Sequence, residues 1–209
     1  MVDTAVTAQN MIDASYIRYA DPAKTEWADA ELLVYLNDGI EYAFQALHKL
    51  NSDLIKTVGS ITTAATTQEY TLNDDFWAMC ENGVTLSGGI SKALVPGTYD
   101  DKTRNGTTTT AADPKVYYLT DTKLGLIPIP TTASAAAYTT ISCRYFKKPT
   151  AIALGGSLPW RNIFNAPIKA FMCSFALLRN QRSLEAQNLI YNTLEAAVVE
   201  LATRRTPKV

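Results

Sequence analysis

The chain has few of the residues from which catalytic and metal sites are usually built. It contains three cysteines and one histidine among 209 residues. Cys80, Cys143 and Cys173 lie far apart, with no CxxC spacing, so we interpret them as small buried hydrophobic residues in a reducing compartment. His48 falls inside a predicted helix beside Lys49, and we interpret it as an ordinary helix residue. The sequence therefore predicts neither a catalytic thiol nor a zinc site.

Enzyme motifs are also missing. The sequence has no GxSxG, HExxH, Walker or GxGxxG pattern. Its clustered acids lack the spacing of a calcium loop and are typical of turn capping. These acids are Asp74, Asp75, Asp100, Asp101 and Asp113. We expect no catalytic residues, no cofactor and no metal, and we keep a cytosolic hydrolase that uses these acids only as the weakest alternative.

The charge balance and the hydropathy exclude two further classes of protein. The formal net charge is −1, which predicts no strong attraction to nucleic acid. Lys147 and Lys148 beside two aromatic residues would suit a nucleic-acid platform, but a strand end that leaves its sheet explains them equally well. The longest apolar run, Ala170 to Leu178, is far shorter than the roughly 20 residues that span a bilayer. The start, MVDTAVTAQN, lacks signal-peptide features, so we expect synthesis in the cytosol and no contact with a membrane.

What the chain does have is an uneven distribution of threonine. Twenty of its 26 threonines lie between Thr57 and Thr150, in a stretch of short alternating segments and turns. Both flanks show the spacing of amphipathic helices. We therefore predict an α+β fold, in which N- and C-terminal helices build a four-helix bundle and an antiparallel β module is inserted as a small sandwich or barrel. The predicted domains are 1–55 with 158–209 for the bundle, and 56–157 for the β module.

The helices of the bundle are predicted from apolar spacing. The first spans about 4–19 and ends before Asp21-Pro22. The second spans about 29–49, with Trp27 just before it and acidic residues in its first turn. The third covers Ile168 to Leu178 and is apolar on nearly every side, which indicates burial or a subunit interface. The fourth runs from Ser183 to about Arg205.

The middle is predicted to hold five to seven strands. Two hairpins are expected, one around Ser87-Gly88-Gly89 and one around Asp121-Thr122. A further strand alternates from Tyr138 to Phe146. The segment from Pro96 to Asp113 has few apolar residues, and we expect a long polar loop that becomes ordered only on assembly.

Three stretches taken together resemble a known family. The first is Trp27 followed by a helix that contains ELL-x-YLND, and the second is Tyr70-Thr71-Leu72-Asn73-Asp74-Asp75-Phe76. The third begins at Leu126-Ile127-Pro128-Ile129-Pro130, continues with Tyr145-Phe146-Lys147-Lys148-Pro149, and ends with Leu158-Pro159-Trp160 and two helices. Their order resembles the adaptor, or head-to-tail connector, proteins of tailed bacteriophages over about Met11 to Arg205. Two positions depart from the family: Ala28 stands where Ser or Thr usually caps the helix, so that Asp29 is the alternative cap, and Asn73 stands where proline is frequent.

The resemblance implies a structural virion protein of the neck that is made in the host cytoplasm. It implies a ring of twelve copies beneath the portal protein, which extends the DNA channel and docks the next neck or tail protein, whether nozzle, stopper or terminator. DNA would pass through without specific binding. The alternative is another virion or tail module whose β insertion binds a partner or a glycan.

The resemblance also implies two contact segments. The C-terminal end is the candidate portal contact, comprising Thr203, Arg204, Arg205, Thr206, Pro207, Lys208 and Val209. The polar segment of the β module is the candidate contact with a neighbouring copy or the tail side, through Gly97, Asp100, Asp101, Arg104, Asn105, Thr107 and Thr108.

Overall fold

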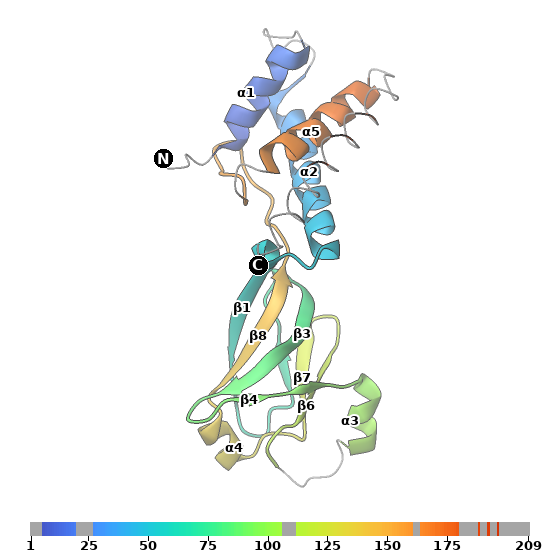
Figure 1. The fold of residues 1–209 in the computed structure, drawn as a ribbon. Helices are drawn as coiled ribbons and strands as arrows, with labels where there is room; N and C mark the ends of the chain where they lie inside the picture. The colour runs from blue at the N-terminus through green and yellow to red at the C-terminus, as the bar shows by residue number, and fades with distance from the viewer. Residues whose placement is uncertain are drawn as a thin grey trace, which may run out of the picture. The chain divides into compact units, whose positions relative to one another are not determined.

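The computed structural model describes residues 6–19, 27–105, 112–160 and 164–179, together with residues 188, 192 and 196. The chain divides into two compact units (Figure 1). The helical unit combines 1–55 with 149–209, and the β unit is the continuous stretch 56–148. No helix among the described residues is long and apolar enough to cross a membrane.

Among the described residues of the helical unit, three helices pack together. They are α1 (Ala8–Tyr19), α2 (Asp29–Lys49) and α5 (Asn165–Arg179). One stripe of α2 is buried, as its apolar spacing predicts: Leu32, Leu36, Gly39, Ile40, Ala43, Phe44 and Leu47. A Cβ atom on Gly39 would lie 3.1 Å from the carbonyl oxygen of Ile168 and 3.3 Å from Cβ of Phe171. The glycine therefore allows α2 and α5 to approach closely.

Residues 149–160, which lead from the β unit back to the helical unit, are here called the return segment, and they pack as part of the helical unit. The backbone N–H groups of Ala8 and Gln9, at the start of α1, donate to the carbonyls of Gly156 and Leu154, each at 2.9 Å. The first N–H groups of a helix have no partner within the helix, so the return segment satisfies them. Thr7 adds a cap, because its hydroxyl accepts from the N–H of Asn10 at 3.2 Å. The return segment therefore fixes the start of α1.

The β unit contains two four-stranded sheets. The first has the order β1-β8-β3-β4, with β1 Lys56–Thr62, β8 Thr140–Lys147, β3 Phe76–Ser87 and β4 Lys92–Ala93. A short 3-10 turn, η1 (Asp53–Ile55), precedes β1. The second sheet has the order β2-β7-β6-β5, with β2 Glu69–Thr71, β7 Lys123–Ile127, β6 Val116–Leu119 and β5 Val95–Pro96.

The inner faces of the two sheets share one hydrophobic core. Strand β8 shows the alternation clearly, because Ile141, Cys143 and Tyr145 are buried at every second position. The core cluster joins residues of both sheets: Tyr70, Leu72, Val84, Leu86, Leu94, Tyr117, Leu124, Leu126, Tyr138, Ile141, Cys143 and Tyr145. The β unit is thus a sandwich.

A bulge interrupts β3 where it faces β8. The register shifts between Met79 and Val84, and Asn82 has a left-handed backbone with φ of 51°. Gly83 follows, and a Cβ atom there would collide with the carbonyl oxygen of Arg144. The bulge lets the 12-residue strand bend along its partner.

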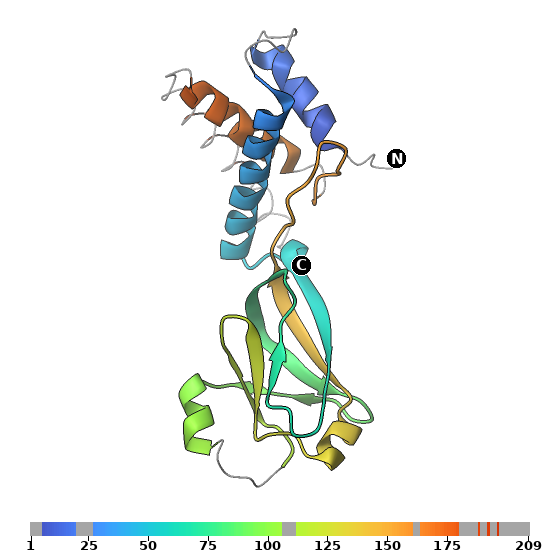
Figure 2. The same cartoon turned by 180° about the vertical axis from the view of Figure 1, so that it is seen from behind.

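The prediction of a four-helix bundle with a small antiparallel insertion is wrong. The described residues form five helices, and two of these, α3 (Tyr99–Asn105) and α4 (Thr132–Ala137), belong to the β unit (Figures 1 and 2). Eight strands form the two sheets. The pair β5–β6 is parallel, because the chain crosses over through α3 between the two strands. Short helices in a Thr-rich segment give no 3.6-residue apolar pattern, so periodicity does not reveal them.

The predicted fourth helix lies almost wholly outside the described residues. Of its range, Asn188, Asn192 and Ala196 are described, and all three are helical and exposed. The hairpins around Gly88 and around Thr122 are confirmed by the pairs β3–β4 and β6–β7.

Candidate contact sites

The candidate contact segment of the β unit contains a helix where the sequence predicts a loop. The start of helix α3 carries one half of a capping box: the Thr98 backbone N–H donates to Oδ2 of Asp101 at 2.7 Å, and the Thr98 hydroxyl donates to the same oxygen at 2.9 Å. Asp100 and Asp101 stand in the first turn, where carboxylates suit the helix dipole. In the sequence, the signal for this helix start is the Thr-x-x-Asp pattern at positions 98–101.

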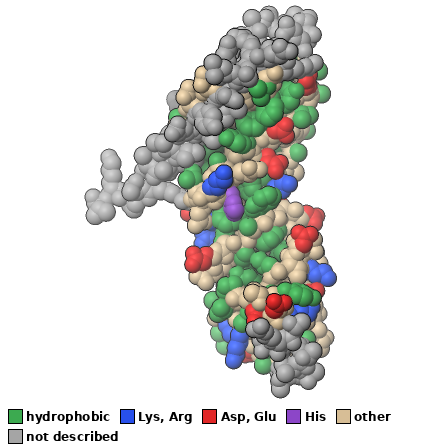
Figure 3. Space-filling view, turned by 90° about the vertical axis from the view of Figure 1, so that its right-hand side faces the viewer, with side chains coloured by type: hydrophobic (Ala, Val, Ile, Leu, Met, Phe, Trp, Pro, Cys, Tyr) green, Lys and Arg blue, Asp and Glu red, His purple; other side chains and the backbone are tan. Residues whose placement is uncertain are grey.

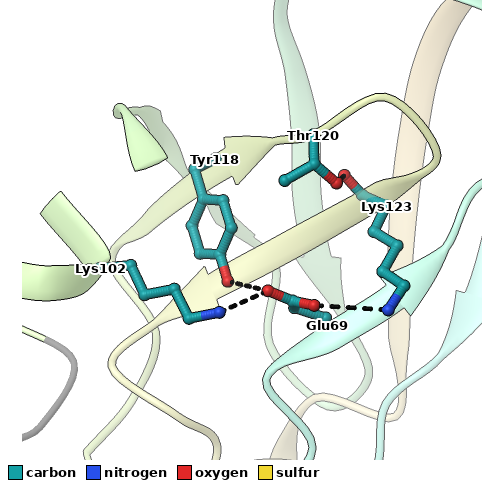
Figure 4. A network of polar contacts seen from close by, with 5 residues as sticks. All are labelled: Glu69, Lys102, Tyr118, Thr120 and Lys123. Carbon is teal, nitrogen blue, oxygen red and sulfur yellow. Dashed lines mark hydrogen bonds and ion pairs between the residues drawn. The ribbon is translucent and has the colours of Figure 1, made fainter. Parts of the chain in front are cut away.

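The carboxylate of Glu69 attaches this helix to the second sheet through Lys102, and it also links three strands of that sheet. Glu69 Oε1 lies 2.6 Å from Lys102 Nζ on α3 and accepts a hydrogen bond from the Tyr118 hydroxyl at 2.8 Å (Figure 4). Its other oxygen lies 3.6 Å from Lys123 Nζ. The loop after β6 is closed beside it, where the Thr120 hydroxyl donates to the carbonyl of Lys123 at 3.3 Å. Residues from β2, β6, β7 and α3 thus meet at Glu69.

Aromatic packing supports the same attachment. The rings of Tyr99 and Tyr118 meet edge to face, with centroids 5.6 Å apart. Lys102 Nζ lies 5.1 Å from the centroid of Tyr99. Beneath Tyr118, a Cβ atom on Gly125 would overlap the tyrosine ring, so only glycine leaves room for it. Tyr99 keeps half of its surface exposed.

The charge states of Glu69 and Tyr118 favour the hydrogen bonds that hold this cluster together. Hydrogen bonds from Lys102 and Tyr118 hold the pKa of Glu69 below its usual range. Burial, and then the hydrogen bond to Glu69, raises the pKa of Tyr118 to about 12. At neutral pH Glu69 is therefore an ionised acceptor and Tyr118 a neutral donor. Hydrogen bonds to an ionised carboxylate are strong, so this cluster holds its residues in place.

A second cluster joins two of the stretches that carry the family resemblance. The Tyr145 hydroxyl donates to Asp75 Oδ1 at 2.7 Å and accepts from the Asn73 amide at 2.9 Å. Lys147 Nζ lies 3.1 Å from Asp75 Oδ2. Burial raises the pKa of Asp75, but the bonds from Tyr145 and Lys147 outweigh it and hold that pKa below its usual range. Asn73, which stands where proline is frequent in the family, therefore makes a contact between distant parts of the sequence.

The structure gathers only part of the predicted contact residues. Gly97 precedes α3, and its N–H donates to the Tyr117 carbonyl at 2.7 Å. Asp100, Asp101, Arg104 and Asn105 all belong to α3. Thr107 and Thr108, and the whole candidate portal contact from Thr203 to Val209, lie outside the described residues.

The residues considered for catalysis are placed as follows. Cys80, Cys143 and Cys173 are buried and form no disulfide among the described residues, and burial raises the pKa of Cys143 to about 11. The ring of His48 stacks against Phe44, one turn earlier in α2. Within the described residues, no group of three or more potential metal ligands occurs.

The chain thus folds into two units, and hydrogen bonds between residues far apart in the sequence connect the elements within each unit. The chain matches the SU10 adaptor protein family over residues 6–209, across both units, and it belongs to that family. It is thus a phage adaptor, a structural component of the virion that interacts with other head-tail proteins. A comparison with curated proteins returns no match.

Proposed function

We propose that the chain assembles into a ring of twelve copies that joins the phage portal to the next neck or tail protein. The observation that carries this proposal is the family match, which covers the helical and β units together. A ring requires interfaces of the heterologous kind, in which one surface of a copy meets a different surface of the next. DNA passes through the ring without specific binding, and the role is structural rather than catalytic.

The proposed portal contact is the C-terminal segment from Thr203 to Val209. Two arginines and a lysine stand in these seven residues. Arginine forms bidentate bonds with carboxylates, which suits it to an interface between proteins. A chain that ends at Ala202 tests this segment, and it should keep its fold but no longer bind the portal protein.

The proposed contact with a neighbouring copy or the tail side is the segment 97–108. Its helix α3 is anchored by Lys102 and Glu69, so this part of the contact is formed before assembly. It presents Tyr99, which is 50% exposed, and the exposed carboxylate of Asp100. Exposed tyrosines on a rigid support are frequent anchors of protein interfaces.

Mixing the purified chain with the cognate portal protein tests the proposal. We expect the two to co-sediment and negative-stain images to show a ring on one end of the portal. The chain truncated after Ala202 should lose co-sedimentation. A chain that stays a monomer or trimer in the presence of portal, or that binds a glycan instead, would contradict the proposal and favour another virion module.

A further inference from the structure

The first sheet of the β unit has a free edge on each side. Strand β1 forms one edge and β4 the other, and no described strand pairs with the outer side of either (Figure 1). Edge strands expose unpaired backbone N–H and C=O groups, and natural proteins usually protect them with charged residues, proline or a bulge. The stretch Thr57–Thr62 of β1 has no charged residue and no proline, and its register with β8 contains no shift. This edge is therefore open to pairing with another strand.

The register shows which backbone groups of β1 are free. The Thr63 N–H donates to the Thr139 carbonyl at 3.1 Å, and in an antiparallel pair such hydrogen-bonded positions alternate with positions whose groups point outward. The N–H and C=O groups of Val58, Ser60 and Thr62 therefore face the free edge. All three residues are exposed, and no described residue bonds to these groups.

The same reasoning applies to β4. The Leu94 N–H donates to the Val84 carbonyl at 3.0 Å, so the backbone groups of Ala93 face outward, and those of Ser91, two residues earlier, face the same way. Both residues are exposed. Each edge of the sheet thus presents backbone donors and acceptors at every second residue.

The two edges also match in direction and in face. Each neighbouring pair in the order β1-β8-β3-β4 is antiparallel, so the two edge strands run in opposite directions. A second copy that continues the sheet in the same orientation therefore brings its β1 antiparallel to β4 of the first copy. Ser60, Ser142, Thr85 and Ala93 form one row across the sheet, so the side chains of both edges lie on the same outer face.

The most exposed large hydrophobic side chains of the described residues lie at these edges. Val58 of β1 is 65% exposed, and Ile90, just before β4, is 68% exposed. The face of the β unit drawn in Figure 3 likewise exposes hydrophobic side chains among polar ones. Apolar side chains beside unpaired backbone groups are typical of an edge that a partner strand covers.

We propose that β1 of one copy pairs antiparallel with β4 of the next copy, so that the first sheets of neighbouring copies join edge to edge. The inference rests on the proposed ring and names the surfaces that join its copies. Ser60 stands opposite Ser91, and Val58 stands opposite Ala93, which covers part of the exposed valine. The interface is heterologous, because β1 meets β4 and not another β1, and a closed ring requires this. The occupant is a second copy because the same sheet supplies both edges in the required directions.

A proline in the free edge tests the interface. Ser60→Pro removes an N–H that faces outward and leaves the hydrogen bonds between β1 and β8 in place. We expect this chain to fold, as measured by circular dichroism, but to form no rings in sedimentation velocity and negative-stain microscopy with the portal protein. The matched control is Thr71→Pro in β2 of the second sheet. The Leu72 N–H donates to the Thr122 carbonyl, so the N–H of Thr71 also faces outward, and this chain should form rings as the unchanged chain does.

Cysteines placed across the interface give a second test, which needs no loss of assembly. Opposite residues of antiparallel strands have Cα atoms about 4.5–5.5 Å apart, which is within the range of a disulfide. Rings of a chain with Ser60→Cys and Ser91→Cys should form disulfide-linked multimers on mild oxidation, seen as a ladder on a non-reducing gel. The control combines Ser60→Cys with Asp121→Cys, at an exposed turn of the second sheet, and should give no ladder.

The outcomes separate this inference from the proposed function. An unchanged chain that forms no ring with portal contradicts the proposed function and the interface together. If the unchanged chain forms rings, a Ser60→Pro chain that still forms them contradicts the interface alone. Rings of the Ser60→Cys, Ser91→Cys chain that do not crosslink also overturn the interface, and this result decides the matter if both proline chains lose their rings.

Discussion

The side-chain amide of Asn37 pairs with the backbone of Ile152 as one strand pairs with another. Its oxygen accepts from the Ile152 N–H at 2.8 Å, and its nitrogen lies 3.2 Å from the Ile152 carbonyl oxygen and 3.0 Å from that of Leu33. The pair spans 115 positions in the sequence. It gives the asparagine of the YLND stretch a structural role, which is to hold the return segment against α2.

We expect Asn37→Ala to destabilise the helical unit by about 1–3 kcal/mol, because both hydrogen-bonding groups of Ile152 lose their partner. The stability of Asn37→Asp should fall between that of Asn37→Ala and that of the unchanged chain, since a carboxylate still accepts from the Ile152 N–H but repels the carbonyl oxygen. Gln45→Ala, at an exposed position of the same helix, is the control and should change little. Chemical denaturation followed by circular dichroism measures the three. Equal stability of Asn37→Ala and the control would refute the role.

Removing one hydroxyl tests the contact between Tyr145 and Asp75. Tyr145→Phe keeps the ring, which lies 5.4 Å from that of Phe76, but loses the bonds to Asp75 and Asn73. We expect a loss of about 1–2 kcal/mol in the free energy of unfolding of the β unit. Tyr138→Phe removes a hydroxyl that bonds to no described residue, and its loss should be much smaller. Similar values for both variants would contradict the assignment.

Gly125 is required by the ring of Tyr118. In Gly125→Ala the new methyl group collides with that ring, so Tyr118 must move and lose its bond to Glu69. Overpacking of this kind costs about 1–3 kcal/mol. Gly89→Ala adds the same methyl group where no atom lies within 4 Å. Thermal unfolding of the two variants should differ clearly, and a Gly125→Ala chain as stable as the control would show that the ring is free to shift.

The Glu69 cluster predicts how stability responds to acid. The pKa of Glu69 is lower in the folded state than its ordinary value of 4.5. The ionised Glu69 therefore adds to the free energy of unfolding at pH values above 4.5. The contribution is lost as the pH falls through the folded-state pKa. Glu69→Gln should therefore be less stable at pH 7 and lose less on acidification. Asp121→Asn, at an exposed position, should follow the unchanged chain. Denaturation midpoints measured from pH 7 to pH 3 test this, and parallel curves for Glu69→Gln and the unchanged chain would contradict it.

Sequence periodicity located most elements but not what fastens them. The stripe of α2 and the alternation of β8 are each repeated over many residues, so they could be predicted. Helix α3 is seven residues long, and its only signal is the cap formed by Thr98 and Asp101. The parallel pair β5–β6 covers two residues on each strand, too few for a pattern.

The clusters at Glu69, at Tyr145 and at Asn37 join residues 33 to 115 positions apart. A single sequence carries no information about such pairs. The motif stretches resemble the family as a set, and the contacts of Tyr145 with Asn73 and Asp75 give a physical reason for two of them to occur together. Asn73 shows this best, since its side chain bonds to Tyr145, 72 positions away.

The measurement that tests the central claim most directly is a cryo-electron microscopy reconstruction of the neck of the phage particle. We expect a ring of twelve copies of this chain between the portal and the next neck or tail protein, with the segments 203–209 against the portal. Density for this chain elsewhere in the virion, or a neck in which the portal contacts the tail directly, would contradict it.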